Sequence, residues 1–256
     1  MQDKVAIVTG ASQGIGRATA SRLARDFSAI VLVARDAQKL RDTERELVAA
    51  GARALVVAQD LGEPSAAADV VDRTLAAFGR IDALVNVAGA VPGVDVFAMT
   101  DAQWDSGLAL KFHGARRLTV HAWPALKASG GSVVFVSGNA AENPRAAQAA
   151  IGAINAAIEA LAKAFSERGV VDGVQVNSVS PGAVMTGRRQ GLLEKGALAQ
   201  GITLDEMKAR FLRAAGIPRF GQPEEIADLI AFVLSDGARW MTGTVLRIDG
   251  GELKSV

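Results

Sequence analysis

Cysteine and tyrosine are absent from this chain of 256 residues, and histidine occurs only twice. Without cysteine the chain cannot form a disulfide, a thiolate nucleophile or a cysteine-ligated metal site, and two histidines are too few for a three-histidine zinc site. Redox chemistry would therefore require a bound cofactor. Positive charge is not in excess either, because 28 lysines and arginines face 27 aspartates and glutamates. This balance argues against a surface built to bind nucleic acid.

The sequence also lacks long uncharged apolar runs. None approaches the ~18 residues of a membrane-spanning helix, so we expect no membrane span. The beginning MQDKVAIVTG places Asp3 and Lys4 before a short apolar run, which is typical of a first strand rather than of a secretory signal. We therefore expect a cytoplasmic protein. The 50% share of hydrophobic residues excludes a disordered chain.

Seven short apolar runs alternate with helical patterns along the chain, which is the order of βαβ units around a parallel sheet. Their continuous Val, Ile and Leu content fits strands covered on both faces. The predicted strands are 4–8, 29–34, 53–58, 83–87, 132–136, 175–180 and 246–249. We expect a single doubly wound α/β domain of the Rossmann type over 1–256, with a seven-stranded parallel sheet flanked by helices. The segment 187–218 interrupts this alternation with several helical turns, and we predict that it forms an inserted lid.

The clearest helical pattern runs from about Ala146 to Arg168. Ile151, Ile154 and Ile158 form part of one apolar stripe at alternating three- and four-residue spacing. Alanine is frequent beside this stripe, and small side chains would let another helix approach closely. We predict a subunit interface of a homo-oligomer here, and an ordinary buried helix is the alternative.

A glycine-rich turn follows the first predicted strand, with Gly10, Gly14 and Gly16 leading into a helical pattern. Glycines let the backbone approach a pyrophosphate, and the helix N-terminus offers free N–H groups and a partial positive charge. The spacing is G-x-x-x-G-x-G rather than the standard G-x-G-x-x-G fingerprint. A tight strand-to-helix connection without a ligand is the alternative for the turn taken by itself.

Five further motifs accompany TGASQGIG at 9–16, in this order: DL at 60–61, NVAG at 86–89, SPG at 180–182, PEEIAD at 223–228 and IDGG at 248–251. Together they make the chain resemble the short-chain dehydrogenase/reductase family from end to end. The resemblance implies an NAD(P)-dependent oxidoreductase with a small-molecule substrate, often a tetramer or dimer. It also implies a set of cofactor-binding positions, which are Gly10, Ser12, Gln13, Gly14, Ile15, Gly16, Arg35, Asp60, Leu61, Asn86, Ala88, Gly89, Pro181, Gly182, Val184 and Thr186. All lie near the carboxyl ends of predicted strands, where open parallel sheets bind ligands.

The residues after the second strand favour NADP(H) over NAD(H). Ala34 stands where NAD-preferring relatives carry an acidic residue, and Arg35 follows, whose guanidinium can grip a 2′-phosphate. The adjacent Asp36 is interpreted as a helix cap. Gln13 occupies a position where many NADP-using relatives have a second basic residue. A solvated surface arginine is the alternative for Arg35.

The catalytic positions of the family are changed in this chain. Relatives use Asn, Ser, Tyr and Lys, but the Tyr and Lys positions here hold Ile151 and Asn155, and the Ser position holds Gly138. Ser137 lies one residue early and would substitute only if the strand end bends. The usual Asn position holds Lys111, so an amide and an amine are exchanged between Lys111 and Asn155.

We predict that Lys111 returns an ammonium to the space beside the nicotinamide ribose, with Asn155 bonded to the ribose or a water. A solvated helix lysine is the alternative. The leading hypothesis is an NADP(H)-dependent oxidoreductase with Lys111, Asn155 and Ser137 in its active site, acting on an activated C=N or C=C bond that needs little proton transfer. A catalytically silent dinucleotide-binding scaffold or sensor, and a non-redox lyase using Lys111, are the two alternatives.

Overall fold

A single parallel sheet of seven strands forms the centre of the computed structural model, which describes residues 3–255. The strand order is β3-β2-β1-β4-β5-β6-β7, and every neighbouring pair is parallel. The strands are β1 (Val5–Thr9), β2 (Ala29–Ala34), β3 (Arg53–Ala58), β4 (Ala83–Asn86), β5 (Ser132–Val136), β6 (Gln175–Pro181) and β7 (Val245–Ile248). The predicted doubly wound sheet is confirmed, and the strand ends differ from prediction by at most one residue. The strand order reverses between β1 and β4, which creates a crevice at their carboxyl ends.

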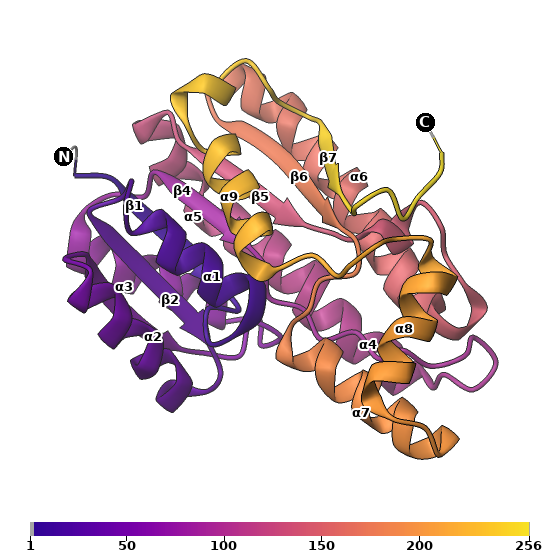
Figure 1. Ribbon diagram of the computed structural model, residues 1–256. Coiled ribbons are helices and arrows are strands. Elements are labelled where there is room, and N and C mark those ends of the chain that lie inside the picture. The colour runs from indigo at the N-terminus through magenta and orange to yellow at the C-terminus, as the bar shows by residue number, and fades with distance from the viewer. Residues whose placement is uncertain (1–2, 256) are drawn as a thin grey trace.

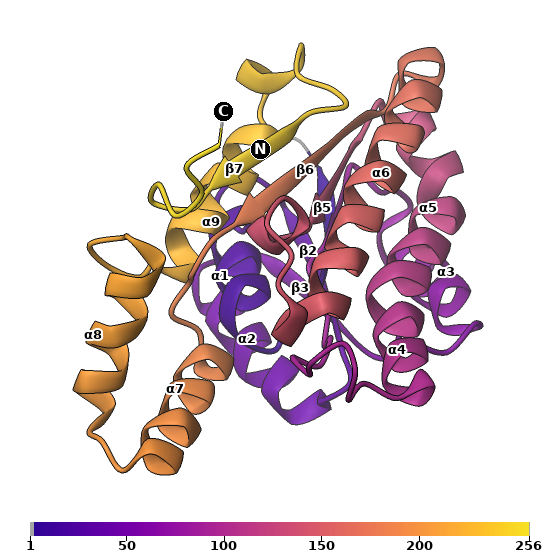
Figure 2. The same cartoon turned by 90° about the vertical axis from the view of Figure 1, so that its right-hand side faces the viewer.

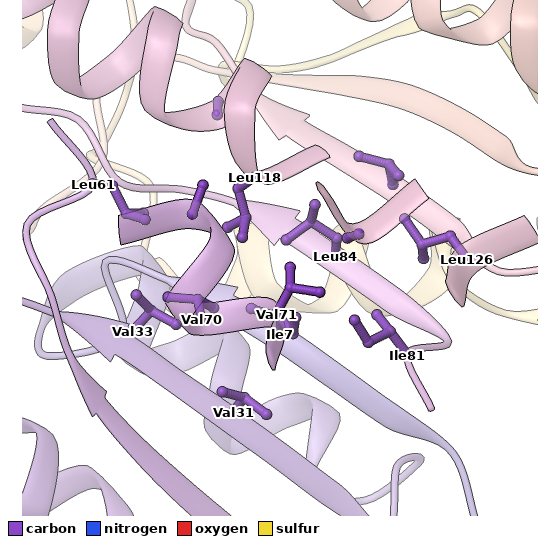
Figure 3. Close-up of a cluster of buried hydrophobic side chains, with 14 of the residues drawn as sticks. Ile7, Val31, Val33, Leu61, Val70, Val71, Ile81, Leu84, Leu118 and Leu126 are labelled. Carbon is purple, nitrogen blue, oxygen red and sulfur yellow. The ribbon is translucent and has the colours of Figure 1, made fainter. Parts of the chain in front are cut away.

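Helices cover both faces of the sheet (Figures 1 and 2). One face packs against α1 (Gly14–Leu23), α2 (Ala37–Ala49) and α9 (Pro223–Val233), and the other against α3 (Ala66–Phe78), α5 (Ala115–Ser129) and α6 (Ala149–Asp172). Figure 3 shows the second layer, where strand residues meet α3 and α5 in one apolar cluster. Each fully buried Leu, Ile or Val there contributes ~1.5–3 kcal/mol. The packing of both layers positions the strand ends at the crevice.

Helix α6 begins and ends later than predicted. Residues Ala146–Gln148 form a 3-10 turn, and α6 runs to Asp172, where Gly173 with φ 76° ends it. Arg168 is therefore inside the helix, with its Nε 2.7 Å from the Asp172 carboxylate. By length and hydropathy alone the segment Ala146–Asp172 could cross a membrane, contrary to expectation, but here it packs against the sheet. The subunit interface predicted for this helix stays a prediction.

The segment 187–218 forms two helices beside the carboxyl edge of the sheet, α7 (Gly187–Gln200) and α8 (Leu204–Ala215), as Figure 2 shows. Thr186 caps α7 by accepting a hydrogen bond from the Arg189 backbone N–H. The two helices share a small apolar cluster of their own, which includes Leu193 and Phe211. Their packing separates this pair from the central core and leaves it next to the crevice.

The chain between β4 and α5 changes helix type. The short helix α4 (Asp101–Gly107) passes into a π-helical segment, Leu108–Gly114, before α5 begins. A π turn holds more residues than an α turn and turns the following side chains to a new direction. Lys111 lies in this segment. The remaining 3-10 turns are Asn139–Ala141 and Asp236–Ala238.

Candidate active site

The glycine-rich turn adopts conformations that favour glycine. Gly10 and Gly14 have φ values of 66° and 54°. A Cβ on Gly16 would lie 2.2 Å from the Gly10 carbonyl oxygen, so the turn closes tightly onto the first residues of α1. The backbone N–H groups at the start of α1 are thereby presented at the crevice, which suits a bound pyrophosphate.

A first pocket lies at the end of β2 beside this turn, and we call it the adenosine pocket. Of the predicted cofactor residues it is lined by Ser12, Gln13, Arg35, Leu61, Ala88 and Gly89. Lys39, in the first turn of α2, also lines it, and sequence reasoning missed it. A signal was available, because Gln13 stands where many NADP-using relatives have a second basic residue, and Lys39 lies in the first turn of the next helix. Two cations at this pocket suit a 2′-phosphate.

Asp36 caps α2, as predicted. Its Oδ1 accepts hydrogen bonds from the Gln38 and Lys39 backbone N–H groups at 3.0 and 3.1 Å. The Lys39 N–H bond is the main reason that the pKa of this carboxyl is lowered, and the Lys39 ammonium adds to it at 3.6 Å. The Asp36 carboxylate is thus held at the N-terminus of α2, directly after Arg35 in the chain.

Asp60 and Asn86 are among the predicted cofactor residues that do not line the adenosine pocket. Asp60 accepts a hydrogen bond from the Gly62 N–H and lies 3.6 Å from the Arg35 guanidinium. Buried Asn86 donates to Thr119 Oγ1, and its own Oδ1 has no hydrogen-bond partner among the described residues. Because that oxygen is fully buried, Asn86 lies inside the fold and does not face the adenosine pocket.

A second pocket meets the adenosine pocket at Gly89, and we call it the reaction pocket. It brings together the predicted cofactor residues of β6 and the following loop with the predicted catalytic residues. Those of its lining residues that the sequence predicted are Ile15, Gly89, Lys111, Ser137, Asn155, Pro181, Gly182, Val184 and Thr186. Residues from six separate parts of the chain therefore converge on one pocket.

Lys111 points into this pocket. Its Nζ donates hydrogen bonds to the Ser137 carbonyl oxygen at 3.1 Å and to Asn155 Oδ1. Its stem runs past Gly89, where a Cβ would lie 2.9 Å from Lys111 Cδ. Burial, and then the Arg188 charge, lower the pKa of Lys111 to about 8, while Glu159 opposes them. The structure thus places Lys111 and Asn155 in direct contact and does not support a solvated lysine.

Gly138 and Asn155 fit each other. Gly138 has φ 153° and ψ 149°, a conformation that is essentially restricted to glycine. A Cβ on Gly138 would lie 2.9 Å from Asn155 Nδ2. A serine at position 138 would therefore be strained and would collide with the amide, so the changes at positions 138 and 155 are linked by packing.

The Ser137 carbonyl oxygen accepts a hydrogen bond from Lys111, whereas the Ser137 hydroxyl points to other partners. The hydroxyl donates to Glu159 Oε1 at 2.6 Å and lies 3.3 Å from the Val179 carbonyl oxygen. Burial raises the pKa of Glu159, and the Ser137 hydrogen bond opposes this shift. Ser137 therefore orients Lys111 through its backbone, whereas its hydroxyl is committed to a neighbouring carboxyl.

The remaining candidate side chains, Ile151 and the two histidines, differ in whether they line the reaction pocket. Ile151, at the tyrosine position, lines the reaction pocket and packs in a cluster with buried Val91. His113 packs edge-to-face on Phe112 with its Nδ1 buried, and His121 is exposed. Neither histidine lines the reaction pocket.

Two arginines of the reaction pocket were missed by sequence reasoning. Arg188 and Arg189 belong to the first turn of α7. Arg188 Nη2 donates to the Val91 carbonyl oxygen at 2.6 Å, and the Arg189 guanidinium lies 5.0 Å from the Phe211 ring centre. No local motif predicts them, because only the docking of α7 against the crevice brings them there.

Known proteins match this chain over its full length. A family model described as enoyl-(acyl carrier protein) reductase matches residues 10–252. Cis-4-hydroxycyclohexanecarboxylate dehydrogenase of Sinomonas cyclohexanicum is 33% identical over 251 residues, which cover 97% of this chain and 96% of that protein. L-sorbose reductase from Gluconobacter frateurii, complexed with NADPH and L-sorbose, has a TM-score of 0.93 at 30% identity, over 100% of this chain and 98% of that chain. YwfH, an NADPH-dependent reductase involved in bacilysin biosynthesis, has a TM-score of 0.92 at 26% identity, over 100% of both chains.

The chain belongs to the short-chain dehydrogenase/reductase family, a family of oxidoreductases, as its motifs predicted.

Proposed function

We propose that this protein is an NADP(H)-dependent oxidoreductase that reduces an activated C=C or C=N bond without a catalytic tyrosine. The observation that carries the proposal is the ammonium of Lys111 in the reaction pocket, which joins the adenosine pocket at Gly89. Because the chain contains no tyrosine, the tyrosine-lysine pair of the family cannot operate here.

The residues present fit NADP(H). The N–H groups at the start of α1, with Ser12 and Gln13, would hold the pyrophosphate, and Arg35 with Lys39 would hold the 2′-phosphate. When bound, NADPH supplies a hydride for the reduction. Positioning in the pocket is the main requirement for that step.

Lys111 has the hydrogen-bonding capacity to assist the reaction. An ammonium carries three N–H donors, and the Ser137 carbonyl and Asn155 amide oxygens use two of them. The third can hydrogen-bond the substrate atom that gains negative charge, or give it a proton from Nζ. A pKa of about 8 leaves Nζ mostly protonated at neutral pH and makes it a stronger acid than an ordinary phenol of pKa ~10.

Cofactor binding is tested by thermal unfolding of the purified protein with NADPH, NADP+, NADH or NAD+. A cofactor at about 100-fold its Kd should add about 2.7 kcal/mol to the free energy of unfolding. We expect a shift with the phosphorylated forms, reduced in Arg35→Ala and unchanged in Arg41→Ala, an exposed arginine of the same helix region that does not line the pocket. No shift with any of the four would refute the oxidoreductase proposal.

The role of Lys111 is tested by NADPH oxidation against a panel of enones and imines. Lys111→Met should lower kcat/KM by about 100-fold or more while NADPH still binds, and the exposed Lys195→Met should retain full activity. Equal rates for wild type and Lys111→Met would exclude Lys111 from the chemistry. NADPH binding without oxidation of any panel member would favour the scaffold or sensor instead.

The lowered pKa of Lys111 also supports a second candidate, a lyase that forms a Schiff base. With a pKa of about 8, about a tenth of the Lys111 amine is neutral and nucleophilic at pH ~7. Borohydride trapping of aldehydes and ketones on Lys111, mapped by mass spectrometry, would support this candidate. Absence of a trapped adduct across the panel would count against it.

A further inference from the structure

The reaction pocket is strongly cationic. Lys111, Arg188 and Arg189 line it, and no aspartate or glutamate of the described residues 3–255 does. The whole chain has a formal net charge of only +1, so this excess is local. The nearest opposing carboxyls, Glu159 and Glu252, lie outside the lining and influence the cations from a distance.

Both opposing carboxyls are already engaged. Glu159 accepts the Ser137 hydroxyl, and Glu252 accepts the Ala183 backbone N–H at 3.0 Å. Across the part of the chain that the structure describes, neither Arg188 nor Arg189 forms an ion pair. Their guanidinium groups keep N–H donors available, because one donates to the Val91 carbonyl and the other is held by stacking on Phe211.

The cationic surface continues into an adjoining cavity. This cavity shares Asn139, Ala140 and Gln148 with the reaction pocket. It adds Arg145, Arg213 and Lys254, with Glu252 as the acidic lining residue. A molecule that enters the reaction pocket from this side therefore passes along positive charge.

We propose that the substrate is an anion, a conjugated carbonyl compound whose carboxylate or phosphate group is held by Arg188 and Arg189 while its reducible bond lies beside Lys111. The proposal rests on the proposed function and narrows its substrate class. An iminium cation is disfavoured, because three like charges would face it in a partly dehydrated pocket. A planar guanidinium pair suits an oxyanion through charge-assisted, paired hydrogen bonds.

The test compares probes that share a shape and differ in charge. Benzoate and benzamide, and cinnamate and cinnamamide, are titrated by calorimetry into the full chain with and without saturating NADP+. We expect each carboxylate to bind about tenfold or more tightly than its amide. Arg189→Gln should bring this ratio close to one. Arg210→Gln, an exposed arginine of α8 that lines neither cavity, should preserve the ratio.

Two results would overturn the proposal. Equal affinity for the carboxylate and the amide in both pairs would show that the pocket does not select anions. Loss of NADPH affinity in Arg189→Gln, with the carboxylate preference retained, would assign the arginine to the cofactor rather than to the substrate. Failure of the proposed function differs from failure of this anion proposal, because it would appear as absence of nucleotide binding in the wild type.

Discussion

Folding should lower the proton affinity of Lys111, and the free energy of unfolding should therefore depend on pH. In the folded state the ammonium lies in the reaction pocket, where burial and Arg188 lower its pKa from 10.5 to about 8. In the unfolded chain it is solvated and keeps its ordinary pKa of ~10.4. Between these two values the unfolded state binds more protons than the folded state, so a rise in pH favours folding. Lys111→Met removes this linkage.

The magnitude follows from the two pKa values. Relative to Lys111→Met, the wild type should gain about 2.5 kcal/mol in its free energy of unfolding between about pH 7 and about pH 10. Below about pH 7 the difference between the two proteins should be nearly constant, because Lys111 is mostly protonated in both states. At neutral pH, removing the desolvated charge offsets the loss of hydrogen bonds to the Ser137 carbonyl and Asn155.

The assay is urea unfolding of the cofactor-free protein at several pH values, with wild type, Lys111→Met and Lys195→Met compared at each. Lys195 is exposed on α7, so its replacement should leave a difference from wild type that does not change with pH. A flat difference for Lys111→Met as well would refute the reasoning, because Lys111 would then keep its ordinary pKa in the folded protein.

Two further predictions concern glycines of the site. Gly138→Ala should lower the free energy of unfolding by about 1–3 kcal/mol, because the conformation is restricted to glycine and the new Cβ would lie 2.9 Å from Asn155 Nδ2. Adding Asn155→Ala to the same chain should restore part of this loss. If denaturant titrations show that the effects of the two changes are fully additive, the contact is contradicted. Gly16→Ala should abolish measurable NADPH binding in calorimetry, because the new Cβ would lie 2.2 Å from the Gly10 carbonyl oxygen. The control Gly191→Ala should bind NADPH normally, because a Cβ there meets nothing within 4 Å. Unchanged NADPH affinity in Gly16→Ala would show that the turn does not hold the cofactor.

The sequence by itself determined the architecture of this protein. Continuous apolar runs can be buried only in strands covered on both faces, and the helical patterns between them require parallel crossover connections. The glycines of the first turn marked the crevice, because the close approach of Gly16 to Gly10 excludes any side chain there. The exchange of Lys111 and Asn155 was also visible, because both positions lie within motifs of fixed spacing in the family.

Only the tertiary structure decided which of those residues come into contact. Lys111 and Asn155 are 44 residues apart, and their contact depends on the π-helical segment, on α6 and on the space left by Gly89. Arg188 belongs to a helical pair whose sequence carries no sign of its position over the reaction pocket. Local sequence patterns specify helices and turns through short-range sterics and hydrogen bonds, whereas the charge of a pocket is the sum over segments that meet only after folding. For that reason the cationic character of this site became visible only in three dimensions.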